Sequence, residues 1–236
     1  MAIASATLAG RKTRCWIEGS PVTAAYVALL LSTHWIVDHA LSRSEAAGAL
    51  LYVSTNLDNL QHHPVQSLIG SALFMDVTLT NVMSLSFVGT LITLVGGICV
   101  ALSLLERRWG ALRAYTIFAL GHVGATLIAA LVIVLALKRG WYPASVRDTY
   151  DYGISYGAQA VLAYATVTLV PRRLRVVRVL CCVSIVAWPF GGMTWMSILP
   201  DFTTLGHLFA ATIGFLSAWR FRGRHREPSE ATVRLE

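Results

Sequence analysis

Two side chains suited to nucleophilic catalysis occur inside apolar stretches of this sequence. Ser155 lies in DYGISYGAQA, and His207 lies in DFTTLGHLFAATIG. A serine hydroxyl becomes a good nucleophile when a base about 2.6–3.2 Å away takes its proton, and histidine can do so near neutral pH. Ionisable groups inside a membrane are costly and tend to mark function. The residues therefore predict a Ser–His pair, although serine in such a segment most often only bonds a backbone carbonyl.

Small residues repeat at every fourth position beside both side chains: they are Gly153 and Gly157 near the serine, and Gly206, Ala210 and Gly214 near the histidine. Helices with such faces approach closely enough for side chains to bond across the contact. We therefore expect the two segments to pack together. The spacing Gly-x-Ser-x-Gly also occurs in soluble hydrolases, but there a strand must precede the serine, and here the segment is a continuous apolar helix.

The elements that position these residues are membrane helices. The 236 residues are 56% apolar and 13% charged, with a mean hydropathy of +0.61, and soluble domains carry about 25% charged residues. Crossing the ~30 Å hydrocarbon layer takes about 20 apolar residues of helix. Six uncharged stretches predict six spans, at 19–37, 77–105, 114–137, 152–171, 179–200 and 202–219. Runs of this length fit helices rather than barrel strands, so the expected fold is an all-α polytopic membrane bundle.

The basic residues predict the orientation of the bundle. Fifteen of the nineteen Lys and Arg residues lie on the side of the N-terminus, so the positive-inside rule places both termini in the cytoplasm. We expect an integral protein of the plasma (inner) membrane, with a cytoplasmic segment at 1–20, a six-helix domain at 21–219 and a basic cytoplasmic tail at 220–236. The net charge of +7 then serves topology and contact with the lipid bilayer; no basic groove interleaved with aromatics indicates nucleic acid.

In this topology, the serine and histidine helices both descend from the outer face. The two side chains lie three and five residues into their spans, or about 4.5 and 7.5 Å below the start of each helix, at a rise of 1.5 Å per residue. The outer connection at 38–78 carries apolar residues at helical spacing, which predicts short amphipathic helices in the outer interface. Pro200 and Asp201 predict a tight turn between the last two spans, with Asp201 capping the final helix.

Other polar residues have weaker implications. His122, inside the third span, is expected to be a packed core residue, and Asp148 and Asp151 are expected to cap the serine helix. The sequence shows no phosphate-binding loop, haem or flavin signature or metal-binding cysteine spacing, so we expect no metal and no cofactor.

From about residue 50 to 219 the chain resembles the rhomboid intramembrane serine proteases and, more closely, the divergent rhomboid-like proteins. It has Glu106-Arg-Arg-Trp-Gly110 after the second span, Gly153-Ile-Ser155 on the fourth, and His207-x-x-Ala210-x-x-x-Gly214 on the sixth. Rhomboids are six-helix bundles with a membrane-embedded first loop, a serine on a short fourth helix and a histidine on the sixth. The resemblance implies a six-helix rhomboid-like bundle with a long membrane-associated first outer loop.

The resemblance also implies roles for individual residues. Ser155 would attack the scissile carbonyl, and His207 would act as general base and then as acid to the leaving amine. Backbone N–H groups beside Gly153 and Tyr156, with Asn81 from the second helix, would bind the oxyanion. In Trp188-Pro189-Phe190-Gly191-Gly192, proline and glycine interrupt the fifth helix; Pro189, Gly191 and Gly192 would form a lateral gate or an ordinary proline kink.

Two departures from the family pattern keep a second function open. Tyr156 stands where the family usually has glycine after the serine, and the second helix lacks the usual histidine and asparagine four residues apart. One function is an intramembrane protease that cleaves single-span membrane proteins near the outer face. The alternative is a catalytically inactive rhomboid-like protein that binds membrane helices as clients. A transporter is disfavoured, because no charge lies at mid-membrane and no internal repeat is visible.

Overall fold

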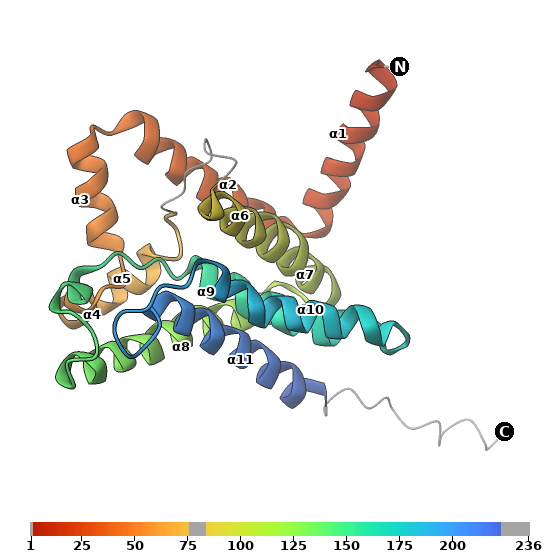
Figure 1. The fold of residues 1–236 in the computed structure, drawn as a ribbon. Helices are drawn as coiled ribbons and strands as arrows, with labels where there is room; N and C mark the ends of the chain where they lie inside the picture. Colours follow the sequence, from red (N-terminus) through yellow and green to blue (C-terminus); the bar gives the residue numbers. More distant parts are fainter. Residues whose placement is uncertain (1, 76–83, 223–236) are drawn as a thin grey trace.

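The computed structural model of the protein describes residues 2–75 and 84–222, and this part of the chain is almost wholly helical (Figure 1). The main helices are α1 (Ala2–Gly19), α2 (Pro21–Trp35), α3 (Arg43–Val53), α4 (Leu57–His62), α5 (Pro64–Gly70), α6 (Leu85–Leu91), α7 (Ser103–Trp109), α8 (Ala111–Lys138), α9 (Ile154–Leu169), α10 (Arg175–Ala187) and α11 (Phe202–Arg222). Two π-helices, η1 (Ile36–Ala40) and the 11-residue η2 (Ile92–Leu102), and three short 3₁₀-helices, η3 (Ala144–Asp148), η4 (Arg172–Leu174) and η5 (Trp188–Gly192), join or extend them. No strand occurs among the described residues beyond an isolated bridge between Trp195 and Pro200.

Four helical segments within the described residues are long and apolar enough to cross a membrane: Ser86–Trp109, Ala111–Lys138, Arg172–Gly192 and Phe202–Phe221. A fifth is possible if α1 and α2, which meet at 108°, count as one broken span. At 16 residues, α9 is shorter than these. The prediction of an all-helical membrane protein is thus confirmed, while the count of six spans stays a prediction.

The fifth helix ends earlier than the expected boundary at residue 200. It stops at Gly192, and a hairpin-like loop follows in which the Asp201 N–H donates to the Thr194 carbonyl at 2.8 Å. The prediction of a tight turn at Pro200 and Asp201 was therefore wrong, because Gly191 and Gly192 end the helix although the residues after them remain apolar. Asp201 does cap α11: its Oδ1 accepts from the Thr204 N–H at 2.9 Å.

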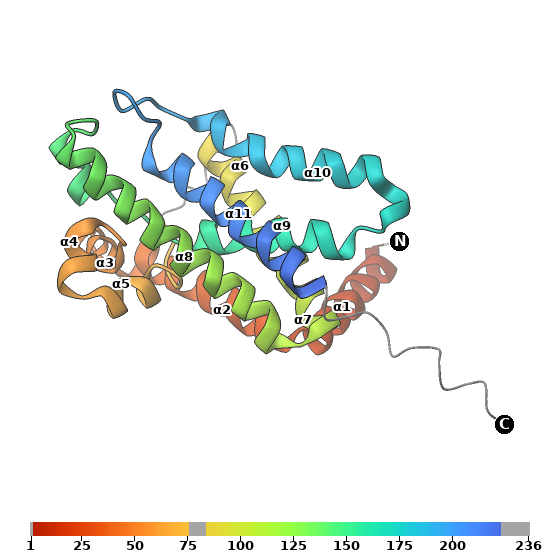
Figure 2. The ribbon, with the colours of Figure 1, turned by 90° about the horizontal axis from the view of Figure 1, so that it is seen from below.

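Helix α9 lies at the centre of the bundle, in contact with α8, α11, α10 and η2 (Figure 2). Its residues Ala158, Ala160, Val161 and Ala163 are fully or almost fully buried. Two glycines explain this closeness. A Cβ on Gly97 of η2 would lie 2.5 Å from the Ala158 Cβ, and one on Gly121 of α8 would lie 2.2 Å from the Ala160 Cβ. Small residues thus place the helix that carries Ser155 in the middle of the molecule.

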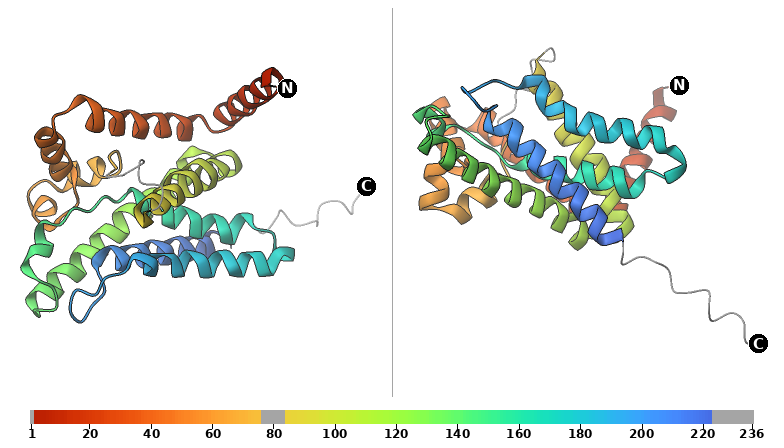
Figure 3. Two further views of the ribbon diagram at one scale, coloured as in Figure 1. Left: turned by 45° about the horizontal axis from the view of Figure 1, so that its top comes forward. Right: turned by 60° about the horizontal axis from the view of Figure 1, so that its bottom comes forward.

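The segment between α2 and α6 folds into the short helices that the apolar spacing predicted, α3, α4 and α5, which stand to one side of the bundle (Figure 3). Asn59 holds this segment together, because its Nδ2 donates to the Leu51 carbonyl at 2.6 Å and to the Ser54 carbonyl at 2.9 Å. The Thr55 N–H then donates to the Asp151 carbonyl at 2.9 Å. The segment is therefore tied directly to the residues just before α9.

At the opposite end of the bundle from α3–α5, Glu106 joins α7 to the start of α2. Its carboxylate accepts from the N–H groups of Val22 and Thr23, at 2.9 and 2.8 Å, and from the Thr23 hydroxyl at 2.6 Å. These are free N–H groups of the first turn of α2, which an acidic side chain stabilises. Gly110, with φ of +83°, then turns the chain into α8, a conformation that glycine adopts at little cost.

Candidate active site

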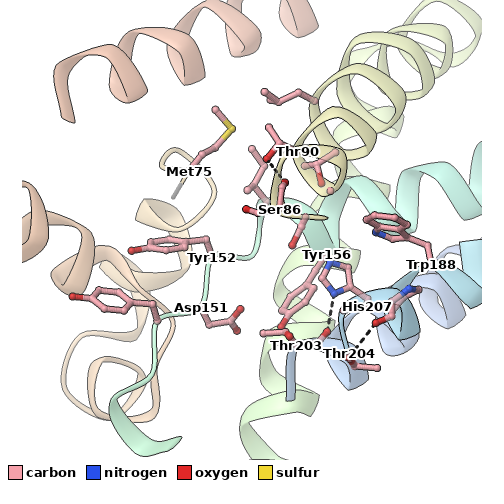
Figure 4. Close-up of a pocket in the computed structure, with 18 residues that line it drawn as sticks. Met75, Ser86, Thr90, Asp151, Tyr152, Tyr156, Trp188, Thr203, Thr204 and His207 are labelled. Atoms are coloured by element: carbon pink, nitrogen blue, oxygen red, sulfur yellow. Dashed lines mark hydrogen bonds between the residues drawn. The ribbon is translucent and has the colours of Figure 1, made fainter. Parts of the chain in front are cut away.

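Ser155 and His207 line one cavity, of about 610 Å³. The cavity lies between α6 and η2 on one side and the start of α9, η5 and the start of α11 on the other (Figure 4). Its lining residues are Met75, Ser86, Gly89, Thr90, Thr93, Leu94, Tyr150, Asp151, Tyr152, Ile154, Ser155, Tyr156, Trp188, Pro189, Gly192, Thr203, Thr204 and His207. The serine and the histidine therefore face the same space from the first turns of two adjacent helices.

A backbone carbonyl orients the imidazole of His207. Its Nδ1 lies 2.7 Å from the carbonyl oxygen of Thr203, one turn earlier on α11 (Figure 4). A carbonyl only accepts, so Nδ1 carries the proton and donates it, and in the neutral ring Nε2 keeps its lone pair. No hydrogen bond joins Ser155 to His207 in the part of the chain that the structure describes. Bonds between catalytic groups often shorten only when a substrate is bound.

Tyr156 lies under the histidine rather than across the cavity. The residue is 1% exposed, and its ring forms a T-shaped contact with the ring of His207, with centroids 5.0 Å apart and planes at 82°. On the other helix it fits against Gly206, where a Cβ would lie 2.4 Å from the tyrosine Cζ. The ring thus occupies the seam between α9 and α11 and forms one wall of the site.

The predicted glycine files divide between two neighbours. Gly206, Ala210 and Gly214 face α9: Ala210 is buried with Tyr156 and Ala160, and a Cβ on Gly214 would lie 2.2 Å from the Ala160 oxygen. The glycines of α9 instead face α8. A Cβ on Gly157 would lie 2.5 Å from the Phe118 ring, and one on Gly153 would lie 1.8 Å from Nδ1 of His122.

His122 was expected to be an ordinary packed core residue, but its side chain also contacts two segments that are distant in sequence. Its Nε2 donates to the Leu68 carbonyl of α5 at 2.7 Å, and its ring lies directly on Gly153. It therefore links α5 to Gly153, the residue just before the serine helix. The sequence around His122 did not indicate these contacts, because Leu68 and Gly153 both lie in other segments of the chain.

Asp151 was expected to cap α9 and does not. The residue at that cap is Gly153, and no side chain bonds the free N–H groups there. Asp151 is instead 8% exposed and lines the cavity, and its backbone is fixed by Ser54 and Thr55: its N–H donates to the Ser54 hydroxyl at 2.8 Å, and its carbonyl accepts from Thr55. Asp148 does not cap α9 either, because no side chain bonds the N–H groups at the start of this helix. It is exposed and does not line the cavity.

Burial raises the pKa of the Asp151 carboxyl to about 6, against smaller opposing effects of hydrogen bonding to Tyr156, Thr55 and the Tyr152 N–H. The Tyr156 hydroxyl lies close enough to influence this carboxyl, yet it is buried without a well-aligned hydrogen bond. An acidic residue four positions before a candidate serine was the available sequence signal for this group.

The segment predicted as a gate forms η5 at the end of the fifth helix. Pro189 and Gly192 line the cavity, whereas Gly191 is exposed with open space around it. The apolar window of this helix is only 11% buried, against 39% in each of the other three candidate spans. Trp188 covers the cavity next to Gly89 of α6, where a Cβ would lie 3.5 Å from the indole.

Asn81, predicted to assist at the oxyanion, lies outside the described residues. The wall opposite Ser155 carries three hydroxyls instead, from Ser86, Thr90 and Thr93. The Thr90 hydroxyl donates to the Ser86 carbonyl at 2.9 Å (Figure 4). Sequence reasoning missed these hydroxyls because serine and threonine are common in apolar helices. Among residues 2–75 and 84–222, no three His, Cys, Asp or Glu side chains gather as a metal site would require.

A family model described as a rhomboid-like protein matches residues 15–227. No curated protein and no solved structure matches the chain.

Proposed function

Because the chain belongs to the rhomboid-like protein family, we propose that it is an intramembrane serine protease that cleaves single-span membrane proteins near the outer face of the plasma (inner) membrane. Ser155 is the nucleophile and His207 the general base. The observation that supports this best is that both residues line one cavity, with the histidine oriented by Thr203 so that Nε2 is free to accept a proton.

In this proposal, Ser155 Oγ attacks the scissile carbonyl carbon while Nε2 of His207 takes the hydroxyl proton. The imidazolium then gives that proton to the leaving amine, and water hydrolyses the acyl-enzyme by the same steps in the second half of the reaction. A carbonyl rather than a carboxylate holds Nδ1, so the pair works as a dyad. The Thr203 carbonyl stabilises the imidazolium through the Nδ1–H bond.

The oxyanion needs donors about 2.7–3.1 Å from its position, and each is worth roughly 3–4 kcal/mol. The N–H groups at the start of α9 have no side-chain cap and are free to donate. The hydroxyls of Ser86, Thr90 and Thr93 on the facing wall are the nearest side-chain candidates, in place of Asn81. Substrate helices reach the cavity past η5, where the helix is little buried and Trp188 closes the side toward α6.

Labelling with a serine-directed fluorophosphonate tests this function. The wild type is expected to be labelled, and Ser155→Ala and His207→Ala are each expected to lose the label. Ser184→Ala is a matched control, because Ser184 is an exposed serine of α10 outside the cavity. A wild type that stays unlabelled under conditions where a soluble serine hydrolase is labelled would contradict the proposal.

One observation favours the alternative, a catalytically inactive rhomboid-like protein that binds membrane helices. Within the described residues, Ser155 and His207 face the same cavity without a hydrogen bond between them. In this case the cavity and the loosely packed fifth helix bind a client helix without cutting it. Photocrosslinking from Phe190 of η5, 47% exposed, would then capture intact single-span proteins equally well in wild type and Ser155→Ala. Capture of shortened products by the wild type alone would contradict the alternative.

A further inference from the structure

The cavity contains one carboxylate. Asp151 is the only Asp or Glu among its lining residues in the described part of the chain, and four aromatic residues, Tyr150, Tyr152, Tyr156 and Trp188, line the same space. Figure 4 shows the Asp151 carboxylate turned toward the side of the cavity where Tyr156 and His207 lie. The site therefore has one acidic group and several aromatic residues in its lining, and both kinds of group can attract cations.

Asp151 has no cationic partner among the residues that the structure describes, since none of the ion pairs found there includes it. A buried carboxylate is costly unless hydrogen bonds or a cation compensate for lost water. Hydrogen bonding from Tyr156, Thr55 and the Tyr152 N–H compensates in part. The Tyr156 hydroxyl beside it, 1% exposed as a residue, also lacks a well-aligned partner. The carboxylate thus has hydrogen-bonding neighbours but no cationic partner in the described part of the chain, and one buried hydroxyl beside it is unsatisfied.

The position of this carboxylate is fixed by the fold. Ser54, itself fully buried, accepts from the Asp151 N–H at 2.8 Å, and the Thr55 N–H and hydroxyl donate to the Asp151 carbonyl at 2.9 and 3.0 Å. Asp151 and Ser155 are four residues apart on the same short approach to α9, and both line the cavity. A cation paired with Asp151 therefore lies close to the carbonyl that Ser155 attacks.

We propose that Asp151 determines specificity, and that the cavity takes the cationic side chain of a lysine or arginine that lies next to the scissile bond of the substrate. A cavity of about 610 Å³ is within the range of sites that enclose a small ligand or one long side chain. The cation pairs with the carboxylate, and the aliphatic part of the side chain packs against apolar and aromatic residues of the cavity lining. The choice of substrate class rests on the proposed protease function; binding of a cation does not.

Binding is measured on the full-length Ser155→Ala protein in a neutral detergent, so that chemistry plays no part. The probes are benzamidine, which is cationic, and benzamide, its neutral counterpart, with affinity obtained by isothermal titration calorimetry. We expect benzamidine to bind at least 10-fold more tightly, because benzamide leaves the carboxylate unpaired. Equal affinities in this parent protein overturn the proposal without any further variant.

Three variants locate the preference. Asp151→Asn is expected to remove it, and Asp151→Glu, which keeps the charge, is expected to retain most of it. Asp148→Asn is the matched control, an exposed acidic residue three positions earlier and outside the cavity, and it should leave the ratio unchanged. A preference that survives Asp151→Asn in a folded protein assigns the cation to another group and refutes the proposal.

Labelling of the wild type separates this proposal from the protease function. Two fluorophosphonates are compared, one with a guanidinium group and one with a neutral group of similar size. If the neutral reagent labels Ser155 and the cationic one has no advantage, the protease function holds and the substrate class is refuted. If neither reagent labels Ser155 although benzamidine binds with the expected dependence on Asp151, the cation site holds and the protease function is refuted.

Discussion

A single methyl group at Gly214 should separate the two helices that carry the candidate dyad. Gly214 lies on α11, two turns after His207, where its backbone touches α9. A Cβ at this position would lie 2.2 Å from the carbonyl oxygen of Ala160 and 2.8 Å from the Cβ of Ala163. Gly214→Ala therefore tests the closeness of the two helices without altering any residue of the cavity.

The size of the effect follows from what must move. Ordinary van der Waals contact begins near 3.4 Å, so the methyl group requires the helices to part by about 1 Å. The nearest atom belongs to the backbone of a buried helix and cannot rotate away. Overpacking of this kind costs about 1–3 kcal/mol, and the backbone contact places Gly214→Ala at the upper end. Each kcal/mol lowers Tm by about 2–4 °C in a domain of this size, so we expect a fall of about 4–12 °C.

Thermal unfolding followed by tryptophan fluorescence in detergent measures this difference. Gly48→Ala is the matched control: Gly48 is also inside a helix, α3, but a Cβ there meets nothing within 4 Å. The control should keep or slightly raise Tm, because alanine favours helix over glycine by about 0.8–1.0 kcal/mol. A Gly214→Ala protein that unfolds at the wild-type temperature would show that α9 and α11 do not approach as closely as described.

Three further predictions concern buried carboxylates. Burial raises the pKa of Asp151 from 3.8 to about 6, so the neutral form of this carboxyl favours the folded state. About 3 kcal/mol of stability is therefore present below pH 3.8 and is lost as the pH rises through about 6. Thermal unfolding across this range should show this pH dependence, and Asp151→Asn should abolish it. Burial would raise the pKa of the Asp201 carboxyl, but hydrogen bonds from Thr203, Thr194 and Thr204 outweigh this effect and lower the pKa. The contribution of this carboxylate to folding stability is thus fully present above pH 3.8 and is lost as the pH falls through the lowered pKa of the folded state. Asp201→Ala should cost about 1–2 kcal/mol of stability at neutral pH, measured as a fall in Tm. Glu106→Ala should cost about 1.5–3 kcal/mol by the same measurement, because it leaves two buried donors of Thr23 and the part-buried N–H of Val22 without their acceptor.

The helices that the sequence located best are those defined by long apolar runs. The predictions of 114–137 and 202–219 correspond closely to α8 and α11. The end of the fifth helix was misplaced because hydropathy reports only whether a segment is apolar. Residues 193–200 are apolar, yet they form a loop after Gly191 and Gly192. Apolar loops and apolar spans differ in backbone geometry, which composition does not record.

The composition of the site was only partly predictable. Ser155 and His207 were predicted as a pair from their place in apolar helices, and they do line one cavity, while their catalytic roles stay a prediction. The glycine spacing beside the histidine correctly indicated a close helix partner. Asp151 was misread as a helix cap, because its true contacts, Ser54 and Thr55, lie about 97 residues earlier. A pattern within one segment cannot show which distant segment folds onto it. Only the three-dimensional structure shows such long-range partners.

The shortness of α9 explains how a polar cavity exists among membrane helices. Sixteen residues extend about 24 Å at 1.5 Å per residue, some 6 Å less than the hydrocarbon layer that the long helices around it cross. Because α8, α11, α10 and η2 contact α9, this short helix can begin inside the bundle without exposing its backbone to lipid. The space above that turn is lined by Thr90, Thr203 and Thr204, whose hydroxyls can hold water. The proposed hydrolysis inside a bilayer would require water at Ser155, and a short central helix with this serine in its first turn would provide a place for it.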